Sequence, residues 1–319
     1  MLLKVADDKS KRIALLEDLR NSSMLDARQK QWLREELGRF KKGIQGERDS
    51  AYYLDQYFKN GENHVVMHDL RFVFEGDVAQ IDHLIINRLG FMFLIETKNY
   101  SGNVSINAHG EFTADYDGDR FGVPSPLEQS HRHERILQKV FERLEIANRV
   151  GGSLECHHVV MFHPKAIINR PGPAEFDTSN VIKADQFPSW HSKFADKTVG
   201  MGMLIRGLAN ARSPETVKEW GERLMRQHRP ADLMALPDFM QPKARPVATG
   251  PKEKPVPSAA EIPMAAKAVA AEGALTGEKK QLVCLKCQSK ISYPEGKYCW
   301  NNAARFGGGQ YCREHQALF

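Results

Sequence analysis

The stretch that decides the fold is residues 79–99, AQIDHLIINRLGFMFLIETKN. Two runs rich in apolar and β-branched residues, 79–87 and 91–99, flank a short break that contains glycine, which is typical of a hairpin. On the second run, Glu96 and Lys98 are two residues apart and therefore share one face of the strand. The sequence predicts a β-hairpin that carries charged side chains within an otherwise apolar pair of strands.

The length of the turn decides whether Asp82 joins that face. With a three-residue loop in which Gly90 takes the left-handed conformation, Asp82 lies opposite Glu96. A two-residue loop would pair Asp82 with Ile95 and send the two carboxylates to opposite faces. A site that uses both carboxylates therefore requires the longer turn or a bulge.

Two carboxylates that face each other repel, so the pair is costly unless a cation lies between them. Hard oxygen ligands favour Mg²⁺ or Mn²⁺, and the carbonyl of Thr97 could supply a further oxygen. Such a cation would activate water and neutralise charge on a phosphodiester, while Lys98 would orient the water or stabilise the developing charge. The alternative is that Asp82 and Glu96 are solvated residues on a half-exposed sheet, with Lys98 as their ion-pair partner.

The flanking sequence alternates between helical and strand periodicities. Apolar spacing predicts helix over 9–40, an interruption at the run 43–47, which holds two glycines, and a second helix over 47–58. Further strands are expected over 64–69, 104–108, 156–162 and 180–184, and further helices over 127–147 after a Ser125 cap and over 214–228 after a Ser213 cap. This order indicates an α/β fold.

Composition suggests four parts: a helical segment over 1–40, a core domain over 41–235, a Pro/Ala/Lys-rich linker over 236–280 and a module over 281–319. Net charge is +5, yet residues 241–319 alone carry +6, so attraction to a polyanion is expected mainly there. No apolar run approaches membrane-spanning length, and the first residues lack the apolar core of a secretory signal. We therefore expect a cytoplasmic protein with no membrane partner.

Four of the five cysteines fall in the last 36 residues. Cys284-x₂-Cys287 and Cys312-x₂-His315 are two chelating pairs separated by 24 residues, which predicts tetrahedral Zn²⁺ held by these four side chains. Cys299 would then be a buried neighbour, and the alternative ligand set has Cys299 in place of His315. Aromatic and basic residues alternate in this module, which suits single-stranded nucleic acid, although the rings could instead form the module's own small core.

The motifs together resemble the nuclease-related (NERD) domain, a branch of the PD-(D/E)XK nuclease-like superfamily. The resemblance covers about residues 41–145 and rests on Gly43-Ile44-Gln45-Gly46-Glu47, Gln80–Ile86, Gly90–Gly102, Pro126, Gln129 and His133. It implies a mixed central sheet flanked by helices, with Asp82, Glu96 and Lys98 as the metal and catalytic centre. The tail resembles the small zinc-ribbon modules of nucleic-acid enzymes.

The resemblance also implies two helper residues. Glu47 would be an auxiliary carboxylate on the first core helix, and Gln129 would approach the centre from the following helix. The other interpretation of Glu47 is a first-turn residue that complements the helix dipole. For His133 a structural hydrogen bond is expected rather than catalysis.

The function implied is hydrolysis of phosphodiester bonds in nucleic acid, with DNA expected rather than RNA. The zinc module would hold the nucleic acid near the core. Two alternatives stay open: a nucleic-acid-binding protein that does not cleave, and a core that the zinc module recruits to a protein partner.

Overall fold

The computed structural model describes residues 1–100, 102–116, 118–198, 201–240, 282–287, 289–306 and 309–316. These residues belong to two compact units, one within Met1–Pro246 and the other within Val247–Phe319. Most of the expected linker over 236–280 lies outside the described residues. Across the described part of the chain, no helix combines the length and the apolar character needed to cross a membrane.

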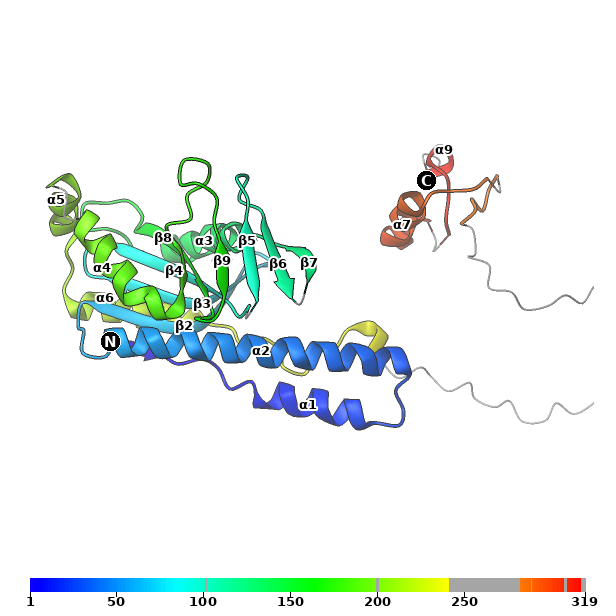
Figure 1. The fold of residues 1–319 in the computed structure, drawn as a ribbon, viewed down its shortest axis with the longest axis horizontal. Coiled ribbons are helices and arrows are strands. Elements are labelled where there is room, and N and C mark those ends of the chain that lie inside the picture. The colour runs from blue at the N-terminus through cyan, green and yellow to red at the C-terminus, as the bar shows by residue number, and fades with distance from the viewer. Residues whose placement is uncertain are drawn as a thin grey trace, which may run out of the picture. The chain divides into compact units, whose positions relative to one another are not determined.

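A six-stranded mixed sheet lies at the centre of the first unit (Figure 1). Its order is β1-β2-β3-β4-β8-β10, formed by Leu2–Lys4, His64–Phe74, Asp77–Asn87, Phe91–Lys98, Glu155–Phe162 and Val181–Lys183. Strands β2, β3 and β4 pair antiparallel, whereas β8 runs parallel to both β4 and β10. The expected α/β class, with a mixed sheet between helices, is confirmed.

Helices cover both faces of this sheet. Helices α2 (Ala27–Phe58) and α4 (Phe187–Thr198) pack on one face, and α3 (Pro126–Arg143) and α6 (Pro214–Gln227) pack on the other. Both α3 and α6 begin as expected, after Ser125 and Ser213 caps with proline in the first turn.

The alternation of side chains along β4 decides which helix each one meets. Met92 and Leu94 belong to the core under α3, whereas Phe93 and Ile95 belong to the core under α2. Glu96 continues the first series and therefore points to the α3 face of the sheet. The first part of β4 is thus apolar on both faces of the sheet, and its polar residues follow at the end of the same strand.

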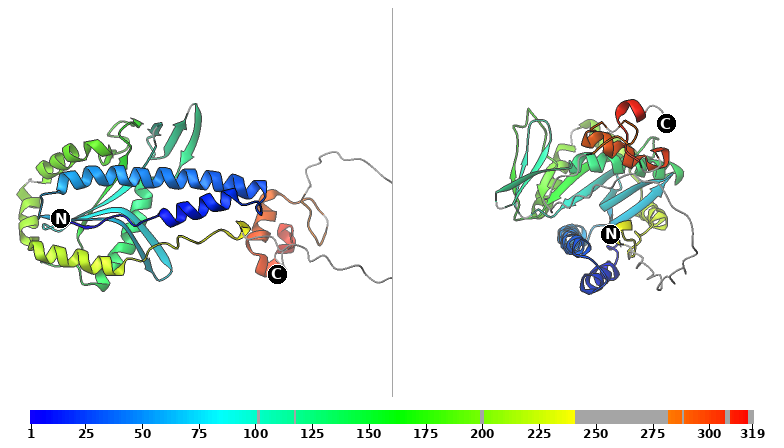
Figure 2. Two further views of the ribbon diagram at one scale, coloured as in Figure 1. Left: turned by 90° about the horizontal axis from the view of Figure 1, so that it is seen from below. Right: turned by 90° about the vertical axis from the view of Figure 1, so that its right-hand side faces the viewer.

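The N-terminal helices differ from the sequence prediction. Helix α1 covers Ser10–Asn21, and α2 runs unbroken through the expected interruption at 43–47 and across the expected boundary at residues 40–41. The break comes earlier, before Asp26, whose side chain forms a capping box with Gln29. Helix α1 packs beside the first part of α2, through a core that includes Leu16 (Figure 2).

Packing explains why Gly46 lies inside a helix. A Cβ atom at this position would lie 2.5 Å from the Cβ of Asn99, just beyond the end of β4. Glycine costs a helix interior about 1 kcal/mol relative to alanine. The glycine therefore serves close approach of α2 to β4, and the prediction that the run 43–47 interrupts the helix was wrong.

A second mixed sheet, β7-β6-β5-β9, was mostly missed from sequence. Its strands are Asp119–Val123, Phe112–Tyr116, Asn103–Ile106 and Ile167–Asn169. Only the strand over 104–108 was expected, because the others are short and lack a sustained alternation. The remaining helices are α5 (Met201–Asn210), α7 (Tyr293–Asn301), α8 (Ala303–Phe306) and α9 (Arg313–Gln316), with 3₁₀ turns at Ala184–Gln186 and Asp238–Met240.

Candidate active site

The turn between β3 and β4 has the longer form. Gly90 takes φ 85°, and the ladder pairs His83 with Ile95. The next position in this register sets Asp82 opposite Glu96. This is the register predicted for the three-residue loop, and it brings the two carboxylates to one face.

Asp82 and Glu96 line a pocket of about 460 Å³ at the end of the hairpin. Glu96 is only 3% exposed. Nζ of Lys98 lies 2.6 Å from Oε1 of Glu96 and 3.1 Å from Oε1 of Gln129. Oδ2 of Asp82 accepts the backbone N–H of Thr97 at 2.8 Å. The structure therefore brings together five of the residues singled out from sequence.

Glu47 reaches the same pocket from α2. It lies in the interior of that helix, so its interpretation as a first-turn residue that complements the dipole is wrong. Its Oε2 accepts from Nζ of Lys9 at 2.8 Å. Lys9 also pairs with Asp69 at 3.2 Å, a buried residue with φ 54° that lies opposite Asp82 in the β2–β3 register.

Sequence reasoning missed Lys9 and Asp69. Both are far from the hairpin motif along the chain, and no local pattern marks them. Asp69 was expected to end a strand, whereas β2 continues to Phe74. A polar residue with positive φ interrupted the alternation that the prediction relied on.

Asp82 and Glu96 are the two carboxylates of the pocket that a divalent cation could join. Lys98 pairs with Glu96, whereas Lys9 pairs with Glu47 and Asp69. Each carboxylate of the central pair also has a second oxygen, Oδ1 of Asp82 and Oε2 of Glu96, that can ligate.

Burial is the largest influence on the pKa of each central side chain. Burial, and then the nearby Glu96 and Glu47, raise the pKa of Asp82 well above its ordinary value. Burial also raises the pKa of Glu96, although Lys98 opposes the shift. Burial by itself would lower the pKa of Lys98, but Glu96 raises it overall. A cation between the carboxylates would favour their ionised forms, so the donor set fits Mg²⁺ or Mn²⁺.

A buried chain of side chains supports Thr97 from the α2 face. Nε2 of His83 lies 3.1 Å from Oγ1 of Thr97, its Nδ1 lies 2.8 Å from Nδ1 of His68, and Nε2 of His68 lies 3.0 Å from Oδ1 of Asp55. Both rings are at most 2% exposed. A carboxylate only accepts, so Nε2 of His68 donates to Asp55.

The polarity of the rest of the chain follows if His68 is neutral. His83 then donates from Nδ1 to His68 and accepts the Thr97 hydroxyl at Nε2. Burial lowers the pKa of His83 well below its ordinary value, which agrees with a neutral ring. Thr97 is thereby held twice, through its hydroxyl by His83 and through its amide by Asp82.

His133 lies beside the centre on α3. Its Nδ1 is 3.9 Å from Oε2 of Glu96, too far for a direct hydrogen bond. Burial, followed by the charge of Arg132, lowers the pKa of His133 to about 4, so the ring is neutral at pH 7. The structure gives no hydrogen bond from His133 to Glu96, and the expected structural bond remains a prediction.

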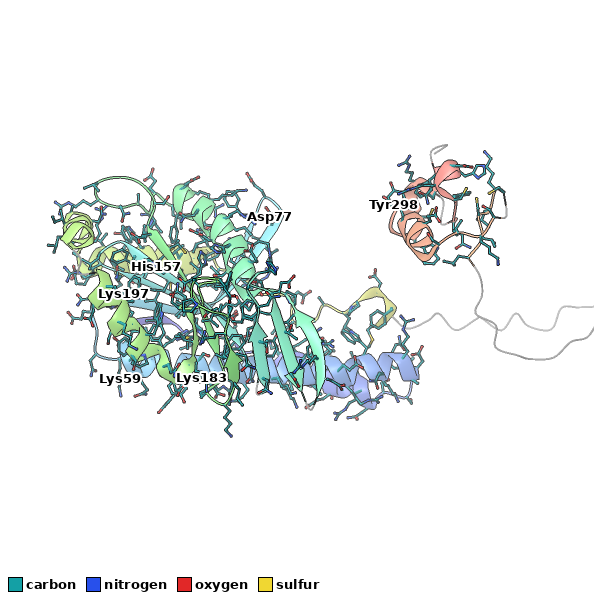
Figure 3. The ribbon with its side chains drawn as sticks, turned by 45° about the horizontal axis from the view of Figure 1, so that its top comes forward. Lys59, Asp77, His157, Lys183, Lys197 and Tyr298 are labelled. Atoms are coloured by element: carbon teal, nitrogen blue, oxygen red, sulfur yellow. The ribbon has the colours of Figure 1, made fainter. Side chains whose placement is uncertain are left out.

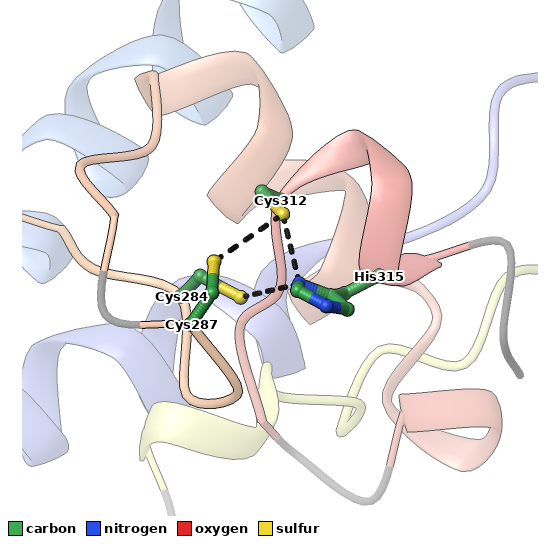
Figure 4. Close-up of side chains that lie close together, drawn as sticks. All are labelled: Cys284, Cys287, Cys312 and His315. Atoms are coloured by element: carbon green, nitrogen blue, oxygen red, sulfur yellow. Dashed lines mark hydrogen bonds between the residues drawn. The ribbon is translucent and has the colours of Figure 1, made fainter.

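In the second unit, the two expected chelating pairs meet (Figure 4). Nδ1 of His315 lies 3.5 Å from Sγ of Cys284 and 3.2 Å from Sγ of Cys312, and Sγ of Cys287 lies 3.8 Å from Sγ of Cys312. Cys299 is fully buried nearby and accepts the backbone N–H of Tyr311 at 3.3 Å. The cluster of three thiols and one imidazole suits Zn²⁺.

One known family matches part of the core. Residues 42–163 match the family model described as "Nuclease-related domain". This segment is a nuclease-related (NERD) domain. It contains Asp82, Glu96 and Lys98 with both helper residues, Glu47 and Gln129, whereas Lys9 lies before it. No curated protein and no solved structure matches the chain.

Proposed function

We propose that this protein hydrolyses phosphodiester bonds of nucleic acid, DNA rather than RNA, with Mg²⁺ or Mn²⁺ at Asp82 and Glu96. The observation that carries the proposal is that Asp82, Glu96 and Lys98 line one pocket of a NERD domain, where Lys98 pairs with Glu96. Burial raises the pKa values of both carboxylates, and the nearby Glu96 and Glu47 raise that of Asp82 further. Perturbed carboxylates of this kind are common at functional sites.

Asp82, Glu96 and the carbonyl of Thr97 are the proposed ligands. When bound, the cation would supply Lewis acidity that lowers the pKa of a water ligand and offsets phosphate charge. The Thr97 amide fixes the orientation of Asp82. Glu47, held by Lys9, adds a further negative charge on the helix side of the pocket.

Lys98 is the proposed electrostatic catalyst. Glu96 and Gln129 hold its ammonium in place, which reduces the reorganisation needed when negative charge develops on the phosphate. Its third N–H can donate to a phosphate oxygen or to the attacking water. Gln129 is then a positioning residue, since its described contact is with Lys98.

The C-terminal unit is the proposed nucleic-acid holder. Zn²⁺ at Cys284, Cys287, Cys312 and His315 would stabilise it. Phe306 is 2% exposed and belongs to its core, whereas Tyr298 and Trp300 are 47% and 43% exposed. Exposed rings can stack on bases, and basic residues of the same unit such as Arg305 can pair with phosphates. A tethered holder raises the local concentration of substrate at the core.

A cleavage assay with the full chain tests the proposal. Single- and double-stranded DNA and RNA are incubated with Mg²⁺ or Mn²⁺, and the Asp82→Ala protein is run in parallel. Divalent-dependent cleavage that Asp82→Ala loses supports hydrolysis. Binding without cleavage on every substrate would favour the non-catalytic alternative.

Deletion of residues 281–319 tests the role of the module. The proposal predicts weaker nucleic-acid binding and a shallower dependence on salt, because phosphate contacts are removed. Unchanged affinity and salt dependence would instead favour a module that recruits a protein partner.

A further inference from the structure

Three side chains with metal-binding groups meet between α3 and β8: His131, Glu134 and His158. One ligand atom from each lies within 4.8 Å of the other two. Oε2 of Glu134 is 3.1 Å from Nε2 of His158 and 4.0 Å from Nδ1 of His131. Tetrahedral zinc with ligands at about 2.0–2.1 Å keeps those ligand atoms roughly 3.3 Å apart. The two separations bracket that value, so small side-chain rotations complete the site.

Ser130 supplies an independent sign that His158 is oriented for ligation. Its hydroxyl is 2.7 Å from Nδ1 of His158, and the serine is only 2% exposed. This contact leaves Nε2 as the nitrogen that faces Glu134. A hydrogen bond to the second ring nitrogen is the usual way in which proteins orient a metal-binding histidine.

The third side chain distinguishes a metal site from a simple hydrogen bond. A hydrogen bond between Glu134 and His158 would by itself leave no role for a third side chain. His131, one helical turn before Glu134, nevertheless lies against His158, with 3.9 Å between the two ring centroids. His131 is 49% exposed, so a fourth coordination position there would be open to water. Cys156 contacts His158 at 3.8 Å but does not belong to the three-residue group.

We propose that His131, Glu134 and His158 form a second metal site on this domain, distinct from the carboxylate pocket, which takes Zn²⁺ with one position left to water. Two imidazoles and one carboxylate favour zinc over Mg²⁺. The bound ion would tie the first turns of α3 to β8. The same turns carry Gln129 and His133 toward β4, so the site would also steady that side of the pocket.

Zinc content of the full chain tests the proposal. Protein is dialysed against Zn²⁺ in excess Mg²⁺, which occupies oxygen-rich sites, and bound zinc is measured by elemental analysis. His131→Gln is the main variant. Because His131 is exposed, its replacement should leave the protein folded, so a loss of zinc could not be attributed to unfolding. The expected result is one equivalent less zinc than in the wild type, whatever amount the C-terminal unit holds. Equal zinc content would overturn the proposal.

Matched variants complete the test. His109→Gln, in an exposed turn, should keep the full zinc content. Ser130→Ala should keep the ligands but weaken zinc affinity about 10- to 100-fold, as loss of an orienting hydrogen bond does. In a Cys312→Ser background, adding zinc should raise the melting temperature of the core, and His131→Gln should abolish that rise. A rise that survives His131→Gln would place the stabilising ion elsewhere and overturn the proposal.

Discussion

The backbone N–H of Thr97 donates a 2.8 Å hydrogen bond to Oδ2 of Asp82, just beyond the last pair of the β3–β4 ladder. A main-chain group of one strand thus holds the carboxylate of the other. The distance between Asp82 and Glu96, which adjoins Thr97, is therefore set by backbone geometry and not by a flexible side-chain contact. A rigid pair of this kind can bind a cation without first becoming ordered.

Asp82→Asn should stabilise the protein when divalent cations are absent. The folded state raises the pKa of Asp82, so it binds this proton more tightly than the unfolded chain does. Stability must then fall as pH rises above the unfolded value of about 3.9. Asparagine cannot ionise but can still accept from Thr97. We expect a gain of about 1 kcal/mol, or roughly 2–4 °C, in thermal unfolding at pH 7.

Divalent cations should stabilise the wild type relative to Asp82→Asn. Mg²⁺ or Mn²⁺ should raise the melting temperature of the wild type, more at pH 8 than at pH 5 because protons compete for the same oxygens, and should have little effect on Asp82→Asn. Equal cation-induced shifts in both proteins would contradict a site at Asp82.

Thr97→Val should show that the histidine chain supports the centre. Valine keeps the shape and the backbone amide but leaves Nε2 of the buried His83 without its partner, at a cost of about 1–3 kcal/mol in urea unfolding. Thr97→Ser keeps the hydroxyl and should retain most of the stability. If valine and serine variants unfold alike, the hydroxyl does not contribute to the chain.

Gly90→Ala should disturb the hairpin more than Gly76→Ala does. Both glycines have positive φ, 85° and 89°, so both replacements incur strain of about 1–2 kcal/mol. Only at Gly90 would the new Cβ overlap a neighbour, Oδ1 of Asn148, whose amide is anchored to Ser153. The additional cost should be about 1–3 kcal/mol, measured by denaturant unfolding. Equal losses of stability in the two variants would mean that the side chain of Asn148 moves aside without cost.

The zinc ligands of the second unit can be separated by substitution. His315→Gln and Cys312→Ser should each remove one equivalent of zinc, whereas Cys299→Ser should not, because Cys299 accepts hydrogen bonds from Tyr311 and Gln316 and lies outside the four-residue cluster. Zinc lost in Cys299→Ser and kept in His315→Gln would favour the alternative ligand set.

The hairpin was readable from sequence because turn chemistry and strand alternation act over a few residues. Gly90 alone distinguished the two registers, and the register determined that Asp82 and Glu96 share a face. The same kind of local reasoning was wrong at Gly46, where it predicted a helix break. The glycine lies within α2 because the distant Asn99 leaves no room for a Cβ atom there.

Contacts between residues far apart in the chain could not be predicted from the sequence, for a similar reason. Lys9 meets Glu47 only because β1 joins the central sheet beside β2 and carries the N-terminal segment to the pocket. The Asp55–His68–His83 chain joins a helix to two strands, and no spacing within one segment encodes it. Such contacts depend on how the elements pack, which a single sequence does not display.

The central claim is that Lys98 acts at a divalent-dependent cleavage centre. The most direct measurement compares rates of Mg²⁺- or Mn²⁺-dependent cleavage of DNA by the wild type, Lys98→Gln and a control, Lys59→Gln. Lys59, labelled in Figure 3, is an exposed lysine at the end of α2 and is not among the residues that line the pocket. The account predicts a rate loss of roughly 10²–10³-fold in Lys98→Gln and no loss in the control. Cleavage by Lys98→Gln at the wild-type rate would contradict it.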